Sequence, residues 1–194
     1  MGKPTYRIEN IVATAEFGIK INLDRLAERI AGAEYNPEAF PGLIIRRHRS
    51  SVLLFSTGKA VITGSKSEEE LERNVSELIT VLEKNGVAVP GKPNVKVQNI
   101  VASGSLGYDV DIEKVALLVS DTFYEPEQFP GLIYRLNELH TVMLIFSSGK
   151  FVCTGAKNKN NVEESIKKAL KVFTDAGALY EPGERFKTEE EALG

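Results

Sequence analysis

Apolar residues recur at helical spacing in two long segments of the chain. In each segment the apolar positions fall on one side of an α-helix, while charged residues occupy the other side. The two stripes consist of Leu71, Val75, Leu78, Ile79 and Leu82, and of Val162, Ile166, Ala169, Leu170 and Phe173. The pattern therefore predicts two long helices that each cover a core.

Both long helices have start and stop signals. Ser67 with Glu70 three residues later forms a capping box, and Asn160 with Glu163 takes the same positions in the second helix. The glycines that follow the two stripes are Gly86 and Gly177. Shorter apolar stripes follow Asn22 and Asp111 and predict two short helices. Between the short and long helices, β-branched and aromatic runs separated by Pro-Gly and Gly predict hairpins.

This order of elements occurs twice. The segment 10–13 (NIVA) returns as 99–102, 89 residues later, and the segment 55–64 returns as 146–155, 91 residues later. The second copy therefore has two extra residues, and a period near 90 is too long for a solenoid. We predict a duplicated half-domain, with repeat 1 in residues 1–90, repeat 2 in 91–180, and an acidic, disordered tail in 181–194.

Several predicted strands are apolar on both faces. Val12 alternates with Ile11 and Ala13, although a half-buried antiparallel sheet has one polar face. If the helices cover one face, the other face remains apolar, and a contiguous apolar patch of that size marks a binding surface. A dimer interface or a sandwich core explains the pattern equally well.

Charge is unevenly placed along the 194 residues. The net charge is only −3, from 24 Lys and Arg against 27 Asp and Glu. Residues 39–66 nevertheless hold five basic residues and no acidic one, whereas residues 68–85 hold six Glu against Arg73 and Lys84. Basic residues around an apolar sheet fit phosphate contacts, although solvated hairpin loops are the simpler alternative.

Residue types exclude several function classes. Cys153 is the only cysteine of the sequence, which excludes an internal disulfide. One cysteine and two histidines, His48 and His140, are too few ligands for a Cys/His zinc cluster. We expect Cys153 to face the helices as a small buried hydrophobe. Paired carboxylates, a Gly-rich phosphate loop and a nucleophile–base pair are missing from the sequence, so it predicts no enzyme, metal or cofactor. Without a signal peptide or a long apolar run, we expect a soluble intracellular protein with no membrane contact.

At these residues the sequence resembles the TATA-box-binding protein family, in both repeats and over roughly residues 6–180. The matching segments are 98–101 (QNIV), 124–127 (YEPE), 129–135 (FPGLIYR), 144–150 (LIFSSGK) and 154–157 (TGAK). The resemblance implies an α+β fold, in which duplicated half-domains form a pseudo-twofold saddle. Its sheet is curved and antiparallel, and the helices lie on the convex face.

The resemblance also implies a general transcription initiation factor. Such a factor binds and bends TATA-like promoter DNA through the minor groove, and recruits transcription factor B and RNA polymerase. The resemblance further implies a sheet that lies in the minor groove, apolar wedges and a kink of ~80°, which are general for this family. The alternative is a divergent paralogue that serves as an accessory nucleic-acid or protein interaction module.

Family roles fall on particular residues of both repeats. The intercalating pairs are Phe40 with Phe55 and Phe129 with Phe146. The minor-groove contacts are Asn10, Val12, Leu53, Val61, Thr63, Asn99, Val101, Leu144, Val152 and Thr154. The phosphate contacts are Arg46, Lys59, Lys66, Arg135, Lys150 and Lys157. Glu125 and Glu127 would contact transcription factor B.

The chemistry of these side chains agrees with the implied target. A·T pairs offer only acceptors in the minor groove, so Asn amides and Thr hydroxyls can donate there. The guanine amino group would instead clash with close-packed Val side chains. Easily unstacked TA steps lower the cost of inserting a phenylalanine.

The first repeat departs from the family in one hairpin. Phe40 and Phe55 are 15 residues apart, whereas Phe129 and Phe146 are 17 apart, the usual spacing. We expect a shorter first hairpin that holds its phenylalanine pair less firmly, with side-chain alternation preserved by the even deletion.

The brief N-terminal arm and acidic tail indicate an archaeal protein of the cytoplasm and nucleoid; a eukaryotic one would be nuclear.

Overall fold

The computed structural model describes residues 2–184, and the chain divides into two compact units. Unit 1 comprises Met1–Ile8 and Ile100–Gly194, and unit 2 comprises Glu9–Asn99. These boundaries differ from the repeats predicted at 1–90 and 91–180. The difference arises because two long strands, β1 (Thr5–Glu16) and β5 (Asn94–Ser105), each contribute residues to both units.

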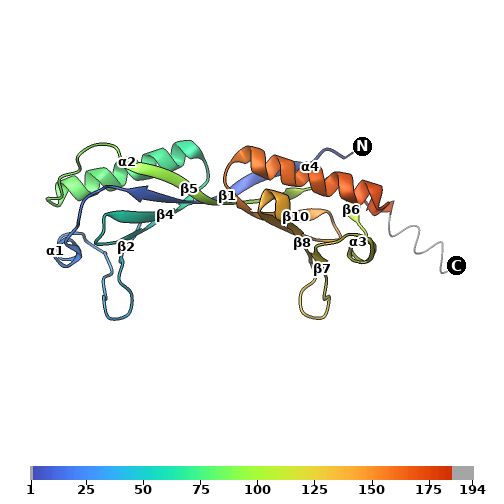
Figure 1. Ribbon diagram of the computed structural model, residues 1–194, viewed down its shortest axis with the longest axis horizontal. Coiled ribbons are helices and arrows are strands. Elements are labelled where there is room, and N and C mark those ends of the chain that lie inside the picture. The colour runs from blue at the N-terminus through green and yellow to red at the C-terminus, as the bar shows by residue number, and fades with distance from the viewer. Residues whose placement is uncertain (1, 185–194) are drawn as a thin grey trace. The chain divides into compact units, whose positions relative to one another are not determined.

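The remaining elements follow the predicted order in each unit (Figure 1). Unit 2 contains α1 (Leu23–Ala27), β2 (Leu43–Arg46), β3 (Ser51–Leu54), β4 (Lys59–Ser65) and α2 (Glu68–Lys84). Unit 1 contains β6 (Asp109–Val110), α3 (Ile112–Leu118), β7 (Thr122–Phe123), β8 (Leu132–Leu136), a 3-10 turn (Asn137–Leu139), β9 (Thr141–Ile145), β10 (Lys150–Ala156), α4 (Lys159–Asp175) and β11 (Leu179–Tyr180).

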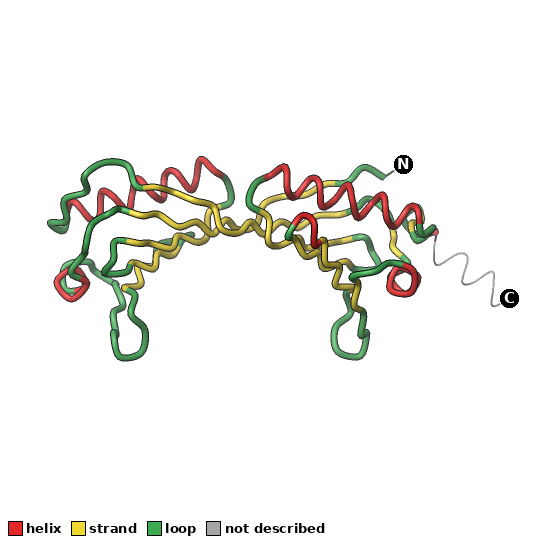
Figure 2. The backbone as a smooth tube through the Cα atoms, viewed as in Figure 1, coloured by secondary structure: helices red, strands yellow, loops and turns green. Residues whose placement is uncertain are grey.

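Each unit is an antiparallel sheet with a long helix along one face (Figures 1 and 2). The strand order is β2-β3-β4-β1-β5 in unit 2 and β1-β5-β10-β9-β8-β7 in unit 1. In both units the loop before β2 or β8 projects away from the sheet, on the side opposite the long helix (Figure 2). The predicted α+β class with duplicated half-domains is therefore confirmed.

Capping side chains explain where the helices begin. Ser67 accepts a hydrogen bond from the Glu70 N–H at 3.1 Å, as predicted, and the Glu70 carboxylate accepts from the Lys66 N–H at 3.0 Å. In α4 the prediction of Asn160 as the cap was wrong. The cap is Asn158, which accepts from Asn161 N–H at 2.8 Å. Asn158 lies 91 residues after Ser67, so the cap follows the repeat, and Asn160 lies inside the first turn.

The core of each unit lies between its sheet and its helices. Alternate residues of every central strand are fully buried under the helix, including Ile11 and Ile62 in unit 2 and Phe151 in unit 1. Cys153 is among them at 0% exposure, which confirms its predicted place, and burial raises the pKa of its thiol to about 11. The opposite residues of these strands are half-buried, so each sheet has one face that no helix covers.

The first four residues of the predicted tail have a defined structure. Residues 181–184 form a turn in which the Gly183 N–H donates to Asp109 Oδ2 at 2.8 Å, after β11 has paired with β6. The rest of the predicted tail, 185–194, lies outside the described residues.

Candidate nucleic-acid interface

All ten predicted minor-groove residues are half-buried positions on the sheet face opposite the helices. In unit 2, Leu53 of β3 pairs with Val61 of β4. In unit 1 the equivalent residues, Leu144 of β9 and Val152 of β10, pair in the same way. We call this uncovered surface of each unit its open face.

Cross-strand pairing extends each apolar pair into a row of four residues. The row in unit 2 is Ile44, Leu53, Val61 and Thr14, and the row in unit 1 is Ile133, Leu144, Val152 and Ser103. The outer members were not predicted as site residues, although their alternation with buried neighbours was visible in the sequence. Each row gives the open face a flat apolar strip that ends in a hydroxyl group.

Asn10 is oriented by hydrogen bonds on the open face of unit 2. Its Oδ1 accepts from the backbone N–H of Gly64 at 2.7 Å, and its Nδ2 donates to Thr63 Oγ1 at 3.1 Å. Because only the oxygen can accept from a backbone N–H, the amide orientation is fixed. The Thr63 hydroxyl donates back to Asn10 Oδ1 at 3.4 Å, so these bonds leave the second Nδ2 hydrogen of Asn10 as the remaining donor.

A β-bulge produces this arrangement. The pairing of β1 with β4 shifts between Ile11↔Ser65 and Ala13↔Ile62, so β4 has one extra residue there. Gly64 lies at this bulge with φ +103°, and a Cβ on it would lie 2.2 Å from the Arg49 carbonyl oxygen. The position therefore requires glycine on both grounds.

Unit 1 has the same bulge in β10, where the pairing with β5 shifts between Cys153 and Ala156. The equivalent Gly155 has φ +94°. Sequence reasoning missed both glycines as site residues, although both lie at the bulges and the N–H of Gly64 orients Asn10. A Thr-Gly dipeptide inside an otherwise β-branched strand was the available signal.

Two phenylalanine pairs flank the open faces. The ring centroids of Phe40 and Phe55 are 5.9 Å apart at an interplanar angle of 66°, and those of Phe129 and Phe146 are 5.9 Å apart at 63°. Phe40 is 39% exposed and Phe129 38%, which is high for so large an apolar ring. The rings thus pack edge to face on each other and remain accessible from solvent.

The first hairpin is shorter, as predicted, yet its phenylalanine pair has nearly the same geometry as the pair of the second hairpin. In the second hairpin the last strand pair is Leu136↔Thr141, and in the first it is Arg46↔Ser51. Arg46 corresponds to Arg135, so the deletion removes one cross-strand pair and leaves a four-residue connection in both hairpins. The lost pair lies at the end of the hairpin away from Phe55.

Predicted phosphate contacts surround the open faces. Arg46, Lys59, Lys66, Arg135, Lys150 and Lys157 are all exposed. Their surroundings differ between units. Arg46 Nε lies 3.1 Å from Glu34 Oε1, whereas the residue equivalent to Glu34 in unit 1 is Phe123. The hydrogen bond and charge of Arg46 lower the pKa of Glu34, and Glu34 in turn raises the pKa of Arg46.

A second carboxylate accompanies the cations of unit 2. Lys59 pairs directly across the sheet with Glu16, while Lys150 pairs with Ser105. The open face of unit 1 thus carries its predicted phosphate contacts without adjacent carboxylates at these two places.

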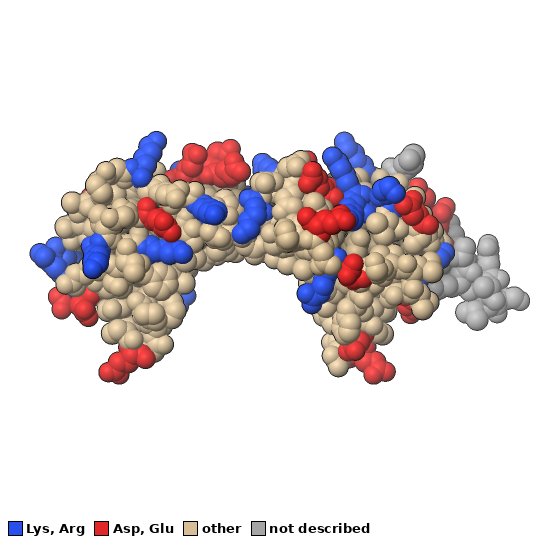
Figure 3. Space-filling model, viewed as in Figure 1, with Lys and Arg blue, Asp and Glu red and all other residues tan. Residues whose placement is uncertain are grey.

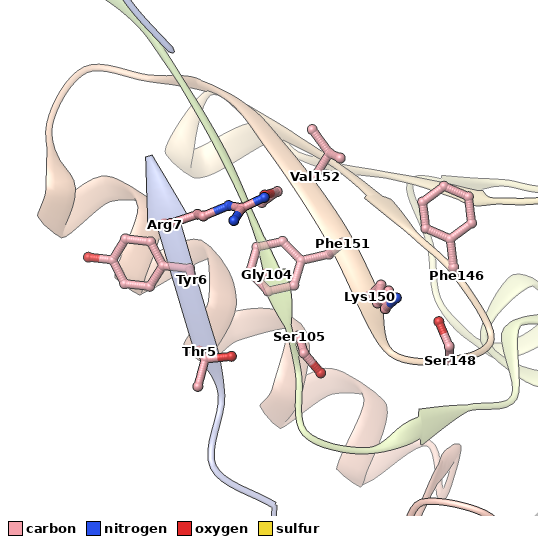
Figure 4. A pocket seen from close by; sticks show the side chains of 11 residues that line it. Thr5, Tyr6, Arg7, Gly104, Ser105, Phe146, Ser148, Lys150, Phe151 and Val152 are labelled. Atoms are coloured by element: carbon pink, nitrogen blue, oxygen red, sulfur yellow. The ribbon is translucent and has the colours of Figure 1, made fainter. Parts of the chain in front are cut away.

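Beside Phe146 the surface of unit 1 has an open depression of about 800 Å³. Figure 4 shows Phe146, Ser148 and Lys150 along one side and Thr5, Tyr6 and Arg7 of β1 along the other. Hydroxyl groups and two cations line it together with an apolar ring, a mixture suited to a sugar–phosphate backbone beside an inserted side chain. Arg7 was not among the residues predicted from sequence.

The predicted partner residues Glu125 and Glu127 are exposed in the loop before β8. Acidic side chains lie at the ends of both projecting loops in the space-filling view (Figure 3). Nearby in the sequence of unit 1, Leu117 is 84% exposed, Leu118 63% and Phe123 53%. The equivalent residues of unit 2 are Glu28, Arg29 and Glu34. Unit 1 alone therefore has apolar side chains in these three exposed positions.

Comparison with known proteins places the chain in a family. The family model described as "Transcription factor TFIID (or TATA-binding protein, TBP)" matches residues 5–85 and 94–176. The chain belongs to the TATA-box-binding protein family. This is a family of DNA-binding transcription factors, not of enzymes, and its two matched segments confirm the duplication.

Relatives in this family come from archaea. A TATA-box-binding protein of Pyrobaculum islandicum is 54% identical over 92% of this chain and 91% of its own. One from Thermococcus kodakarensis is 42% identical over 95% and 98%. The solved structure of Methanococcus jannaschii TBP has a TM-score of 0.84 at 41% identity, covering 89% of this chain and 99% of that one. The TATA-box-binding fold is thus shared nearly along the whole chain.

Two structural features are absent from residues 2–184. Within that part of the chain, no helix is long and apolar enough to cross a membrane. In the same residues, no group of three or more His, Cys, Asp or Glu side chains could hold a metal ion.

Proposed function

We propose that this protein binds TATA-like promoter DNA through the open faces of both units, in the minor groove. The observation that carries the proposal is the orientation of Asn10. Its Oδ1 accepts from the Gly64 N–H and one Nδ2 hydrogen goes to Thr63, so the second Nδ2 hydrogen remains as a donor among the half-buried Val and Leu side chains of the open face. A·T pairs present acceptors at the groove floor, and the extra amino group of guanine would meet the packed Val and Leu side chains.

We further propose that the phenylalanine pairs bend the DNA. Phe40 and Phe129 already project as exposed rings, each braced by a partner ring at 5.9 Å. A braced ring can enter a base step without first losing a buried contact. Unstacking a step costs a few kcal/mol, which the bend repays through additional protein contacts.

The proposed partners are transcription factor B and, through it, RNA polymerase, at the archaeal nucleoid. Glu125 and Glu127 of unit 1 provide an acidic site, and the exposed Leu117, Leu118 and Phe123 supply apolar area that unit 2 lacks. A partner that reads these differences would bind one unit only, and so would give direction to an assembly on a nearly symmetric DNA-binding surface.

A competition gel shift tests the DNA proposal. We expect a TATA-containing duplex to bind far more tightly than one in which the A·T pairs are replaced by G·C, since each wrong pair costs about 1–3 kcal/mol. Affinity should fall steeply with salt, and Lys150→Ala should flatten the slope of log K against log salt by about one unit. Equal binding of both duplexes would disprove minor-groove recognition by this face.

A further inference from the structure

The helix-covered side of unit 2 has an apolar groove between α2 and the start of β5. Its volume is about 500 Å³. The apolar lining consists of Leu71, Val75, Ile79, Pro93, Val95 and Val97. Val95 is 39% exposed, although it belongs to a strand. The groove lies on the face opposite the proposed DNA contacts of the same unit.

Acidic residues border this groove. Glu68 and Glu72 of α2 lie along it, and Lys92 is the one cation among its lining residues. Elsewhere on α2, Glu77 is paired with Arg47, and the Glu70 carboxylate accepts the Lys66 N–H. Within residues 2–184, the carboxylates of Glu68 and Glu72 have no ion-pair partner. The space-filling view shows the acidic side chains gathered over α2 (Figure 3).

Unit 1 shows what fits such a groove. There, the residue equivalent to Val95 is Tyr6, and the residue equivalent to Glu72 is Glu163. The Tyr6 hydroxyl donates to Glu163 Oε1 at 2.8 Å, so the ring bridges from β1 to α4. Burial and this hydrogen bond raise the pKa of Tyr6. In unit 2 a valine stands at this place, and Glu72 lacks the phenol that its counterpart binds.

The helices beside the two sites also differ in charge. The sequence of α2 contains six Glu against Arg73 and Lys84, whereas that of α4 contains four Lys against Glu163, Glu164 and Asp175. A duplicated structure would otherwise present the same chemistry twice. The site in unit 2 combines an uncovered apolar groove with an acidic border, whereas in unit 1 Tyr6 bridges the strand to the helix.

We propose that the groove of unit 2 docks a protein segment in which a tyrosine or another large apolar side chain is flanked by Lys or Arg. The side chain would occupy the groove against Val95 and Val75, as Tyr6 occupies its own site. The flanking cations would lie against Glu68 and Glu72. Carboxylates repel phosphate, so the acidic border disfavours nucleic acid as the occupant. The partner is a basic peptide segment that can bind while DNA occupies the open face.

A peptide-binding measurement with the full chain tests this. The probe is a fluorescent peptide with one Tyr flanked on both sides by Lys, and the matched probes carry Tyr→Ala or Glu in place of Lys. We expect saturable binding of the first probe by fluorescence anisotropy and at least tenfold weaker binding of both others. A saturating TATA duplex should leave this binding unchanged, and loss of binding with DNA present would place the peptide on the open face instead.

Two variants locate the site. Val95→Tyr places in the groove a tyrosine ring like that of Tyr6 in unit 1. Because this ring fills the site, the variant should not bind the peptide. Glu72→Lys changes only an exposed charge and should weaken binding at least tenfold. Glu164→Lys makes the same charge change on α4 and should have no effect.

All three variants should keep the thermal midpoint and the TATA affinity of the parent chain. If the Lys-flanked peptide fails to bind, or if Val95→Tyr and Glu72→Lys bind it like the parent, the proposal is wrong. A failure of TATA binding with peptide binding intact would instead contradict only the proposed DNA function.

Discussion

Arg46 and Arg135 occupy equivalent places on the two open faces but have different neighbours. The Arg46 guanidinium makes two hydrogen bonds to Glu34, from Nε at 3.1 Å and from Nη2 at 3.4 Å. Arg135 has Phe123 in the position of that carboxylate. An arginine that is already bound to a carboxylate interacts more weakly with an approaching phosphate. The carboxylate itself also repels the phosphate.

We therefore predict unequal contributions from the two arginines to DNA binding. Arg135→Ala should reduce the slope of log K against log salt by about one unit, and Arg46→Ala by less. Glu34→Gln should tighten binding and steepen the slope, because it releases Arg46. Salt titrations of the three variants with one TATA duplex measure this. Equal slopes for Arg46→Ala and Arg135→Ala would contradict it.

Mild acid cannot replace the Glu34→Gln substitution in this test. Arg46 lowers the pKa of Glu34. A carboxylate with a lowered pKa keeps its ion pair at neutral pH and loses it only as the pH falls through that lowered value. At pH 6 to 8 the pair therefore stays formed, and DNA binding should show no pH step from Glu34 in this range.

At the level of elements, the hairpins that carry Phe55 and Phe146 differ in length, but their phenylalanine pairs have nearly the same geometry. One cross-strand pair is missing from the first, at the end away from the phenylalanine. Each hairpin end is tied to the long helix of its unit by an ion pair of opposite polarity, Arg47 with Glu77 in unit 2 and Glu138 with Lys168 in unit 1. The shorter hairpin thus keeps the same kind of contact to its helix as the longer one, with the charges reversed.

Phe55→Ala and Phe146→Ala should consequently cause equal losses of DNA bending. Each removes the ring that braces an exposed partner, and a lost base–aromatic contact costs about 1–3 kcal/mol of binding. Energy transfer between dyes at the two ends of a TATA duplex reports the bend. A clearly smaller loss for Phe55→Ala would show that the shorter hairpin does weaken its wedge. No loss from either variant would remove the phenylalanines from the DNA interface.

The helix cap found at Asn158 gives a stability prediction with an internal control. Asn158→Ala should lower the free energy of unfolding by about 1 kcal/mol, because the Asn161 N–H loses its acceptor. Asn160→Ala, two residues on, is exposed and should change it by less than about 0.5 kcal/mol. Denaturant titration compares the two. A larger cost at Asn160 would favour the cap predicted from sequence.

Sequence reasoning found the elements and the open face, but not the local geometry that makes the site specific. Alternation of Val12 with Ile11 and Ala13 was enough to predict two apolar faces, since side chains alternate strictly along a strand. The bulge at Gly64 breaks this alternation through backbone pairing with β1, and the Thr-Gly dipeptide signals it only in part, since a strand glycine alone does not specify the register with the partner strand. Asn158 was missed because Asn158, Asn160 and Asn161 are all possible caps, and only the repeat offset distinguishes them.

For the whole molecule, the differences between the units matter more than their likeness. The cations of unit 2 have Glu34 and Glu16 as neighbours, and its long helix is acidic. Unit 1 has Phe123 and Ser105 in the equivalent places, with exposed Leu117 and Leu118 nearby. A binding partner thus meets two distinguishable surfaces, although the three apolar residues of each open-face row are identical and only Thr14 and Ser103 differ.

Charge reversal at the projecting loops tests whether a partner uses this difference. Glu125→Arg with Glu127→Arg should leave DNA binding nearly unchanged and abolish the ternary complex with transcription factor B. The equivalent change in unit 2, Asn36→Arg with Glu38→Arg, is the matched control and should leave the complex intact. Native gel electrophoresis with purified transcription factor B distinguishes these outcomes. An intact complex after the Glu125 and Glu127 changes would show that the partner binds elsewhere.

The shared strands β1 and β5 bear on the origin of the duplication. Because unit 2 ends with Asn99 and unit 1 includes Met1–Ile8, neither compact unit can be built from a single repeat. An ancestral protein of one repeat with this topology would have completed its sheet only with the strand of a second copy. Gene fusion would then have converted an obligatory dimer into one chain. After fusion each half was free to acquire its own side chains, as with the charged Glu34 and the apolar Phe123 at equivalent positions, without losing the pairing that both require.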